Sequence, residues 1–221
     1  MSPRFTLRIQ LLFLLGLSFS ATAETVSVNF VGSAGANGSL APGDEAGASP
    51  ATHWNNVTVS GAALVDATGA ATGITVTFGA GGWMNTLNTG DSPNQRLMRG
   101  YLDIGGQAVT TVTLNGLDAA KTYRIFLYAD GENTFDAEPV SRTGTYTVGG
   151  TATGITDTAG EQFEGTFQSV FPGTTGEGNY TSAVVSGAAS YAISIRGTAA
   201  DGIDGVYRSP LNALQVVEVT E

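Results

Sequence analysis

Apolar and polar side chains alternate along many short stretches of this chain. Val26–Phe30 and Ile74–Phe78 both alternate apolar residues with serine, asparagine or threonine. A period of two residues places the apolar side chains on one face of an extended strand. The strongest example is Thr122–Tyr128, in which Tyr123, Ile125 and Leu127 share one face and Arg124, Phe126 and Tyr128 share the other. The same pattern predicts further strands at Thr111–Leu114, Thr143–Val148, Gln162–Val170, Thr181–Val185, Tyr191–Arg196 and Ala213–Val219.

Glycine-rich turns such as Gly79–Gly82, Gly149-Gly150 and Gly176–Gly178 separate the predicted strands. No segment has a convincing helical period, and Ala46–Asn55 and Asn94–Tyr101 could each hold one turn of helix at most. Many short strands with regular turns are typical of a sandwich or barrel. We therefore predict an all-β fold, an antiparallel β-sandwich of the jelly-roll type, with the first and last strands side by side.

The N-terminal segment has the order of a secretory signal. Arg4 and Arg8 precede the apolar run Leu11–Phe19, and the small residues Ala21–Ala23 follow it. This order predicts a signal peptide at residues 1–23, cleaved before Glu24. The alternative is a membrane anchor, but a span needs roughly 20 apolar residues. We expect an exported protein (secreted, periplasmic or at the cell surface), with one domain at residues 24–221 and no membrane span in the mature chain.

The composition of the chain argues against several classes of function. All 19 acidic residues but only seven of the nine basic ones follow residue 23, so the mature chain has a net charge of −12. Such a surface repels phosphate backbones, which argues against a nucleic-acid partner. The chain has no cysteine and one histidine, His53. Disulfides, thiol nucleophiles, thiolate metal sites and multi-histidine metal sites are therefore excluded.

Several motifs together resemble a known group of proteins. They are SVNF (Ser27–Phe30), HWNNV (His53–Val57), LVDATGAATGITVTF (Leu64–Phe78), LMRGYLD (Leu97–Asp103), LNGLDAAKTYRIFLYADG (Leu114–Gly131), GEGNY (Gly176–Tyr180) and LNALQVVEV (Leu211–Val219). The chain resembles exported planctomycete and verrucomicrobial proteins with a galactose-binding-like jelly roll, similar to many carbohydrate-binding modules. The resemblance implies a sandwich fold, a glycan ligand bound by loops at one end, and often one structural calcium ion.

The two tryptophans are the first candidates for sugar binding, because a pyranose ring can pack its C–H face on an aromatic plane. Trp54 precedes two asparagines, whereas Trp83 follows a glycine-rich turn and lies two residues before Asn85. The alternative is a structural role for each ring, and we expect Trp54 to be in the core. For Trp83 both interpretations stay open.

Two further polar–aromatic pairs, Arg99 with Tyr101 and Tyr207 with Arg208, are candidates for the same ligand site. Loops carry binding residues, but they also collect polar residues that serve only solubility. Asp130 with Glu132, and Asp201 with Asp204, are the candidates for a calcium ion, which prefers oxygen ligands. A solvated acidic turn is the alternative at both places, since neither has an EF-hand pattern. No other cofactor is expected.

Catalytic motifs are scarce in this sequence. There is no G-x-S-x-G elbow to accompany His53, and the sole lysine, Lys121, follows alanine rather than the glycine of a phosphate-binding loop. We therefore predict a secreted, non-catalytic carbohydrate-binding protein. The first alternative is a structural or adhesive exoprotein, and the second is a glycan-active enzyme with two close carboxylates.

Overall fold

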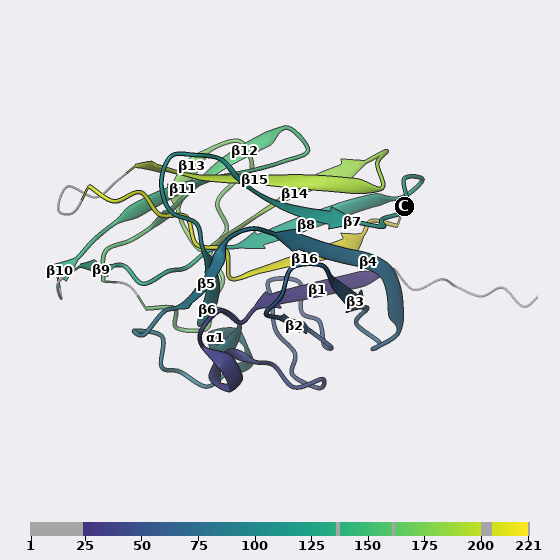
Figure 1. The fold of residues 1–221 in the computed structure, drawn as a ribbon, viewed down its shortest axis with the longest axis horizontal. Coiled ribbons are helices and arrows are strands. Elements are labelled where there is room, and N and C mark those ends of the chain that lie inside the picture. Colours follow the sequence, from purple (N-terminus) through teal and green to yellow (C-terminus); the bar gives the residue numbers. More distant parts are fainter. Residues whose placement is uncertain (1–23, 136–137, 161, 200–204, 221) are drawn as a thin grey trace, which may run out of the picture.

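Two β-sheets stacked face to face form the protein (Figure 1). The computed structural model describes residues 24–135, 138–160, 162–199 and 205–220. Five strands form one sheet, in the order β14 (Tyr180–Ser186), β8 (Thr122–Tyr128), β16 (Ala213–Glu218), β1 (Thr25–Phe30) and β2 (Asn55–Val57). Seven form the other, in the order β13 (Thr175–Glu177), β12 (Thr151–Asp157), β11 (Arg142–Val148), β15 (Ser190–Ala199), β7 (Thr110–Asn115), β4 (Ala71–Phe78) and β3 (Ala62–Val65).

Most neighbouring strands are antiparallel, and only β1–β2 and β12–β13 are parallel among the described pairs of the two sheets. The prediction of an all-β, antiparallel sandwich is therefore confirmed, while the jelly-roll topology stays a prediction. The first and last strands do lie side by side, because β1 pairs with β16 in a register that places Thr25 opposite Val217. The predicted signal peptide lies outside the described residues.

The apolar side chains that alternate along the strands fill the space between the two sheets. Ile125 and Leu127 of β8 point into the same core cluster as Leu214 of β16 and Val112 of β7, and all four are fully buried. The apolar faces predicted for the two sheets therefore meet, which removes these side chains from water.

A second apolar cluster covers the other face of the five-stranded sheet. Tyr128 and Ala213 are paired across β8 and β16, and both belong to this second cluster rather than the first. Trp54 joins them at 4% exposure and donates its indole N–H to the Ala51 carbonyl at 2.9 Å. The prediction that Trp54 lies in the core is confirmed. Strand β8 is buried on both faces at its C-terminal end, next to the loop that carries the candidate site.

One short helix, α1 (Pro93–Leu97), covers this second cluster through Leu97. Ser92 caps it by accepting from the Gln95 N–H. The helix overlaps the first part of the predicted segment Asn94–Tyr101, whereas Ala46–Asn55 contains a β-bridge and turns and no helix. A 3-10 turn lies at Gly35–Gly38. No helix in the described part of the chain is long and apolar enough to cross a membrane.

The strand predicted at Gln162–Val170 is wrong, because this segment is a loop with a bridge at Ser169 only. Gly165 has a φ of +93°, which interrupts an extended strand. Phe163 and Phe167 on either side of it pack against each other with ring centroids 5.1 Å apart. The aromatic side chains therefore join the second cluster instead of alternating across a sheet.

Two small two-stranded ribbons lie outside the two main sheets. Strand β5 (Gly81–Met84) pairs with β6 (Gly100–Asp103), and β9 (Thr134–Phe135) pairs with β10 (Glu138–Pro139). The β5–β6 pair approaches the end of β1 so closely that a Cβ on Gly100 would lie 2.0 Å from the Val31 carbonyl oxygen. Only glycine permits this approach, and it places Trp83 of β5 beside the loop that follows β8.

Candidate ligand-binding site

The loop Ala129–Asn133, which follows β8, is the centre of the candidate site. The Asp130 N–H donates to Asn212 Oδ1 at 2.7 Å, and the Gly131 N–H donates to Asp157 Oδ2 at 2.8 Å. Asn133 donates through Nδ2 to the other carboxylate oxygen of Asp157 at 3.1 Å. Because side chains from distant segments bind its backbone, the loop has one defined conformation on which side chains can be presented.

Trp83 lies at the surface beside this loop, with 52% of its side chain exposed. Its indole N–H donates to Glu132 Oε2 at 3.4 Å, and the Thr86 hydroxyl donates to Glu132 Oε1 at 2.5 Å. Both carboxylate oxygens of Glu132 are therefore engaged. One edge of the indole is held by Glu132, while half of the side chain stays accessible to a ligand.

Asn85, in contrast, is buried and forms a wall of the site. Its Nδ2 donates to Asp130 Oδ2 at 3.0 Å and to the Gly131 carbonyl at 2.8 Å. Asp130 lines one hollow of the surface and Asn85 lines another. The Asn85–Asp130 pair thus separates two adjacent hollows.

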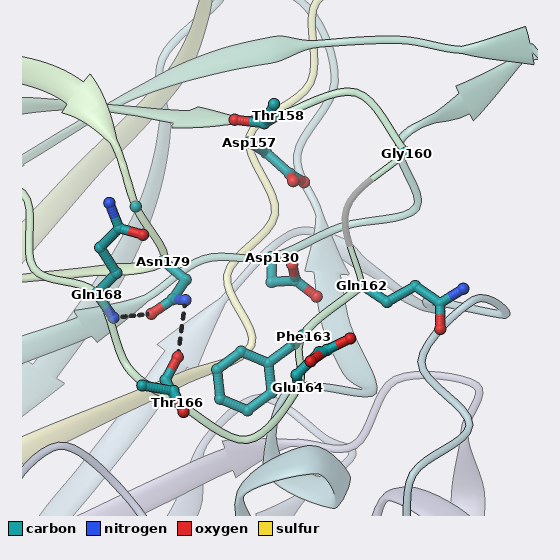
Figure 2. Close-up of a pocket in the computed structure, with 11 residues that line it drawn as sticks. Asp130, Asp157, Thr158, Gly160, Gln162, Phe163, Glu164, Thr166, Gln168 and Asn179 are labelled. Atoms are coloured by element: carbon teal, nitrogen blue, oxygen red, sulfur yellow. Dashed lines mark hydrogen bonds between the residues drawn. The ribbon is translucent and has the colours of Figure 1, made fainter.

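The first hollow has a volume of about 540 Å³ (Figure 2). Carboxylates, amides and hydroxyls line it almost throughout: Asp130, Asp157, Glu164, Gln162, Gln168, Asn179, Thr158 and Thr166, together with Phe163, Gly160 and Gly178. Figure 2 shows the carboxylates of Asp157 and Asp130 on one side and the Phe163 ring and Glu164 on another. None of the described residues that line the hollow is a lysine or an arginine, and the hollow offers many hydrogen-bond acceptors.

Asparagine side chains shape the wall of this hollow. Asn179 accepts from the Gln168 N–H at 2.9 Å and donates to the Thr166 carbonyl at 3.3 Å (Figure 2). Asn94 of α1 donates to the Gly165 carbonyl at 3.1 Å and ties the same loop to the helix. Within the loop, Phe163 is buried while Glu164 is exposed. Phe163 and the two asparagines therefore hold the backbone of this loop, while polar side chains such as Glu164 are exposed to the solvent.

The second hollow, of about 360 Å³, lies between Asn37 and the segment that follows β5. Arg99 is at its base and only 9% exposed. The Arg99 guanidinium donates to the carbonyls of Asn88 (2.9 Å), Asn37 (2.6 Å) and Gly90 (2.5 Å). Arg99 therefore joins the loop that contains Asn88 and Gly90 to the turn at Asn37, and most of its hydrogen-bonding capacity is used within the protein.

Tyr101 and Arg208 line a small hollow together with Glu132, whereas Tyr207 lies against Gly197 of β15. Tyr101 is opposite Trp83 in the β5–β6 pair but is only 3% exposed, and burial raises the pKa of its phenol above the ordinary value. Arg208 forms an ion pair with Asp103, with Nη1 2.5 Å from Oδ2. The Tyr207 carbonyl accepts from the Gly106 N–H at 2.8 Å. The fold therefore brings Tyr101 and Arg208 next to Glu132, while no contact joins Tyr207 to Trp83 in the described residues.

The predicted calcium ligands have other partners here. Asp130 binds Asn85, and Glu132 binds Trp83 and Thr86. In the residues that the structure describes, no group of three or more histidine, aspartate or glutamate side chains is arranged to hold a metal ion. Asp201 and Asp204 lie outside the described residues. The calcium site stays a prediction.

Sequence reasoning selected Trp83, Asn85, Asp130 and Glu132 separately, for two different ligands, and the fold brings all four together. It missed the first hollow, whose lining includes Asp157, Glu164, Gln168 and Asn179. The polar run around Phe163 could have indicated a loop, but the apparent alternation favoured a strand.

Comparison with models of protein families, with curated proteins and with solved structures gives no match to this chain. The resemblance to galactose-binding-like modules therefore rests on the motifs in the sequence. The functional argument below starts from the geometry of the two hollows and of Trp83.

Proposed function

We propose that the protein binds a carbohydrate without altering it, at the loop end formed by Trp83, Glu132 and the two adjacent hollows. The observation that carries the proposal is the half-exposed Trp83 ring, whose N–H is held by Glu132. A sugar can pack its C–H face on such a ring. Since the ring is already oriented, less conformational entropy is lost on binding than with a free side chain.

The chemistry of the first hollow supports the same ligand class. Sugar hydroxyls are donors and acceptors, and the hollow supplies carboxylate acceptors and amides that can do both. Hydrogen bonds to carboxylates are the stronger kind. The acidic lining and the negative net charge disfavour sulfated or uronic-acid polymers. A neutral or amine-bearing glycan fits best.

The partners of the acidic side chains support binding without catalysis. A glycosidase needs one carboxyl group as acid and another as nucleophile or base. Glu132 accepts from Trp83 and Thr86 through separate oxygens, which favours an orienting role. His53 contacts the Ala67 carbonyl at 3.0 Å and the hydroxyl of its neighbour Thr52 at 3.2 Å, both through Nδ1, which favours a structural role.

The test is retardation of the purified protein in native gels cast with a panel of soluble polysaccharides. Trp83→Ala is expected to weaken binding about ten-fold, as for the loss of about 1.4 kcal/mol of stacking. Phe171→Ala is the matched control, because this ring is also exposed, at 75%, but belongs to the turn Phe171–Thr174 ahead of β13 rather than to β5.

Equal retardation of Trp83→Ala and the wild-type protein would contradict the proposed site. If no polysaccharide retards the wild-type protein, the structural or adhesive alternative gains support instead. Running the gels with calcium and with a chelator tests the predicted calcium ion in the same experiment, since a structural ion near Asp130 would make retardation sensitive to the chelator.

A further inference from the structure

The backbone nitrogen of Glu24 lies against a carboxylate at the start of strand β1. The Glu24 N–H donates to Glu218 Oε2 at 3.1 Å, and the Glu218 N–H donates back to the Glu24 carbonyl at 2.8 Å. The antiparallel pairing of Thr25 with Val217 follows directly. The last strand of the sheet therefore fixes the position of the Glu24 nitrogen.

The charges around this nitrogen are not balanced. Lys121 Nζ lies 3.1 Å from Glu218 Oε2 and 3.8 Å from Glu24 Oε2, so one cation faces two carboxylates. Asp118 adds a third negative charge to the environment of Glu218, and the Tyr123 hydroxyl accepts from the Asp118 N–H at 3.1 Å. Hydrogen bonds from the Glu24 backbone and from Lys121 lower the pKa of Glu218, and Glu218 raises the pKa of Lys121.

We propose that Glu218 is a preformed acceptor for the new N-terminus created by cleavage before Glu24. Hydrolysis of the Ala23–Glu24 peptide bond by an exported endopeptidase consumes one water molecule. It leaves a carboxylate on Ala23 and an amine on Glu24, which takes up a proton at neutral pH. The amide that donates to Glu218 becomes an ammonium group at the same place, and the two cations then face Glu24 and Glu218.

The physical consequence is a more stable mature protein. An ammonium–carboxylate hydrogen bond is stronger than one from a neutral amide. The ordinary pKa of an α-amino group is about 7.7–8.0, and pairing with Glu218 raises it in the folded state. The added stability is therefore fully present below about pH 7.7, and it is lost as the pH rises through the raised pKa of the α-amino group in the folded state. This inference does not depend on the proposed glycan binding.

The experiment starts from the full chain, expressed in a bacterial host that exports it. Intact mass of the product is expected to show Glu24 as its first residue. The matched control has one alanine inserted between Ala23 and Glu24, which leaves an extra residue on the product and moves the amine away from Glu218. Its own mass confirms the altered N-terminus.

The midpoint of thermal unfolding is then measured for four proteins: both products, each with Glu218 and with the substitution Glu218→Gln. Together they form a double-mutant cycle. At pH 6 the inserted alanine should lower the midpoint by about 2–4 °C in the wild-type background, as for roughly 1 kcal/mol in a chain of this size. It should have no effect in the Glu218→Gln background, nor at pH 10. Because Lys121 is present in all four proteins, its own contribution to stability cancels in the cycle. A product that begins at any other residue, or an equal effect of the insertion in both backgrounds, would overturn the proposal.

Discussion

At the scale of single residues, buried amide side chains position the candidate site. Asn212 is fully buried and bonds with both ends of its side chain. Its Oδ1 accepts from the Asp130 N–H, while its Nδ2 donates to the carbonyls of Met98 at 2.9 Å and Gly100 at 3.1 Å. One side chain thus connects the loop after β8, the start of β6 and the segment before β16. An apolar residue at this place would leave three buried backbone groups without this partner.

Asn212→Ala is therefore expected to lower the free energy of unfolding by about 3 kcal/mol, since each unsatisfied buried group costs about 1–3 kcal/mol. Urea denaturation monitored by circular dichroism measures the change. Asn115→Ala is the matched control: Asn115 accepts from the Ser190 hydroxyl in a partly exposed pair, and its removal should cost less than about 0.5 kcal/mol. Similar midpoints for the two variants would show that Asn212 does not hold the loop.

The two tryptophans show what sequence reasoning can and cannot decide about a residue. Trp54 precedes the strand Asn55–Val57, and its predicted burial is confirmed. Trp83 has a similar local sequence, with an asparagine two positions later, but its exposure depends on β5 pairing with β6 outside the two main sheets. No short-range pattern contains that information, because exposure is set by segments far away in the chain.

At the scale of elements, the loop that forms the wall of the first hollow depends on α1. Asn94 of this helix accepts from the Gly47 N–H at 3.0 Å and donates to the Gly165 carbonyl. The helix has only five residues, so it is held by its packing and its cap rather than by its own hydrogen bonds. It acts as a bridge between two loops.

Asn94→Ala should release the loop Gln162–Gln168 without unfolding the sandwich. The loss of a hydrogen bond worth about 1 kcal/mol should speed amide exchange in this loop about five-fold. Hydrogen–deuterium exchange with mass spectrometry measures it, and polysaccharide retardation should weaken in parallel. Asn115→Ala again serves as control. Unchanged exchange in this loop would argue that Phe163 and Asn179 alone hold it.

At the scale of the whole molecule, buried tyrosines bind segments that lie far apart in the chain. Tyr146 donates its hydroxyl to the Pro210 carbonyl at 2.6 Å, and Tyr128 donates to Gln215. Tyr101 and Tyr123 are likewise almost fully buried. Burial raises the pKa of all four phenols above the ordinary value of about 10.

These shifts predict how the protein responds to alkali. A raised pKa means that the folded state keeps protons that the unfolded state releases, so stability falls as the pH rises above about 10. The buried phenols should ionise only as the sandwich opens. Absorbance at 295 nm and circular dichroism should then show one shared, cooperative alkaline transition. Ionisation of all the tyrosines before any loss of circular dichroism would contradict this prediction.

The sequence alone determined the fold class and most strands of this protein. The alternation of apolar residues specifies a buried face for each strand, and this requirement is local, so β1, β8 and β16 can be recognised before their partners are known. The predicted strand at Gln162–Val170 failed because Gly165 and two aromatic anchors allow the segment to pack as a loop.

Only the tertiary structure decided the candidate site. The segment Trp83–Asn85, Asp130 and Asn179 come from three separate parts of the chain. Their proximity depends on the close approach of β5–β6 to β1 and on the hydrogen bonds made by Asn212 and Asp157. The hydrogen bond between Glu24 and Glu218 likewise results from the pairing of the first strand with the last. Such contacts join residues far apart in the chain, and local side-chain patterns carry no information about which distant segments will meet.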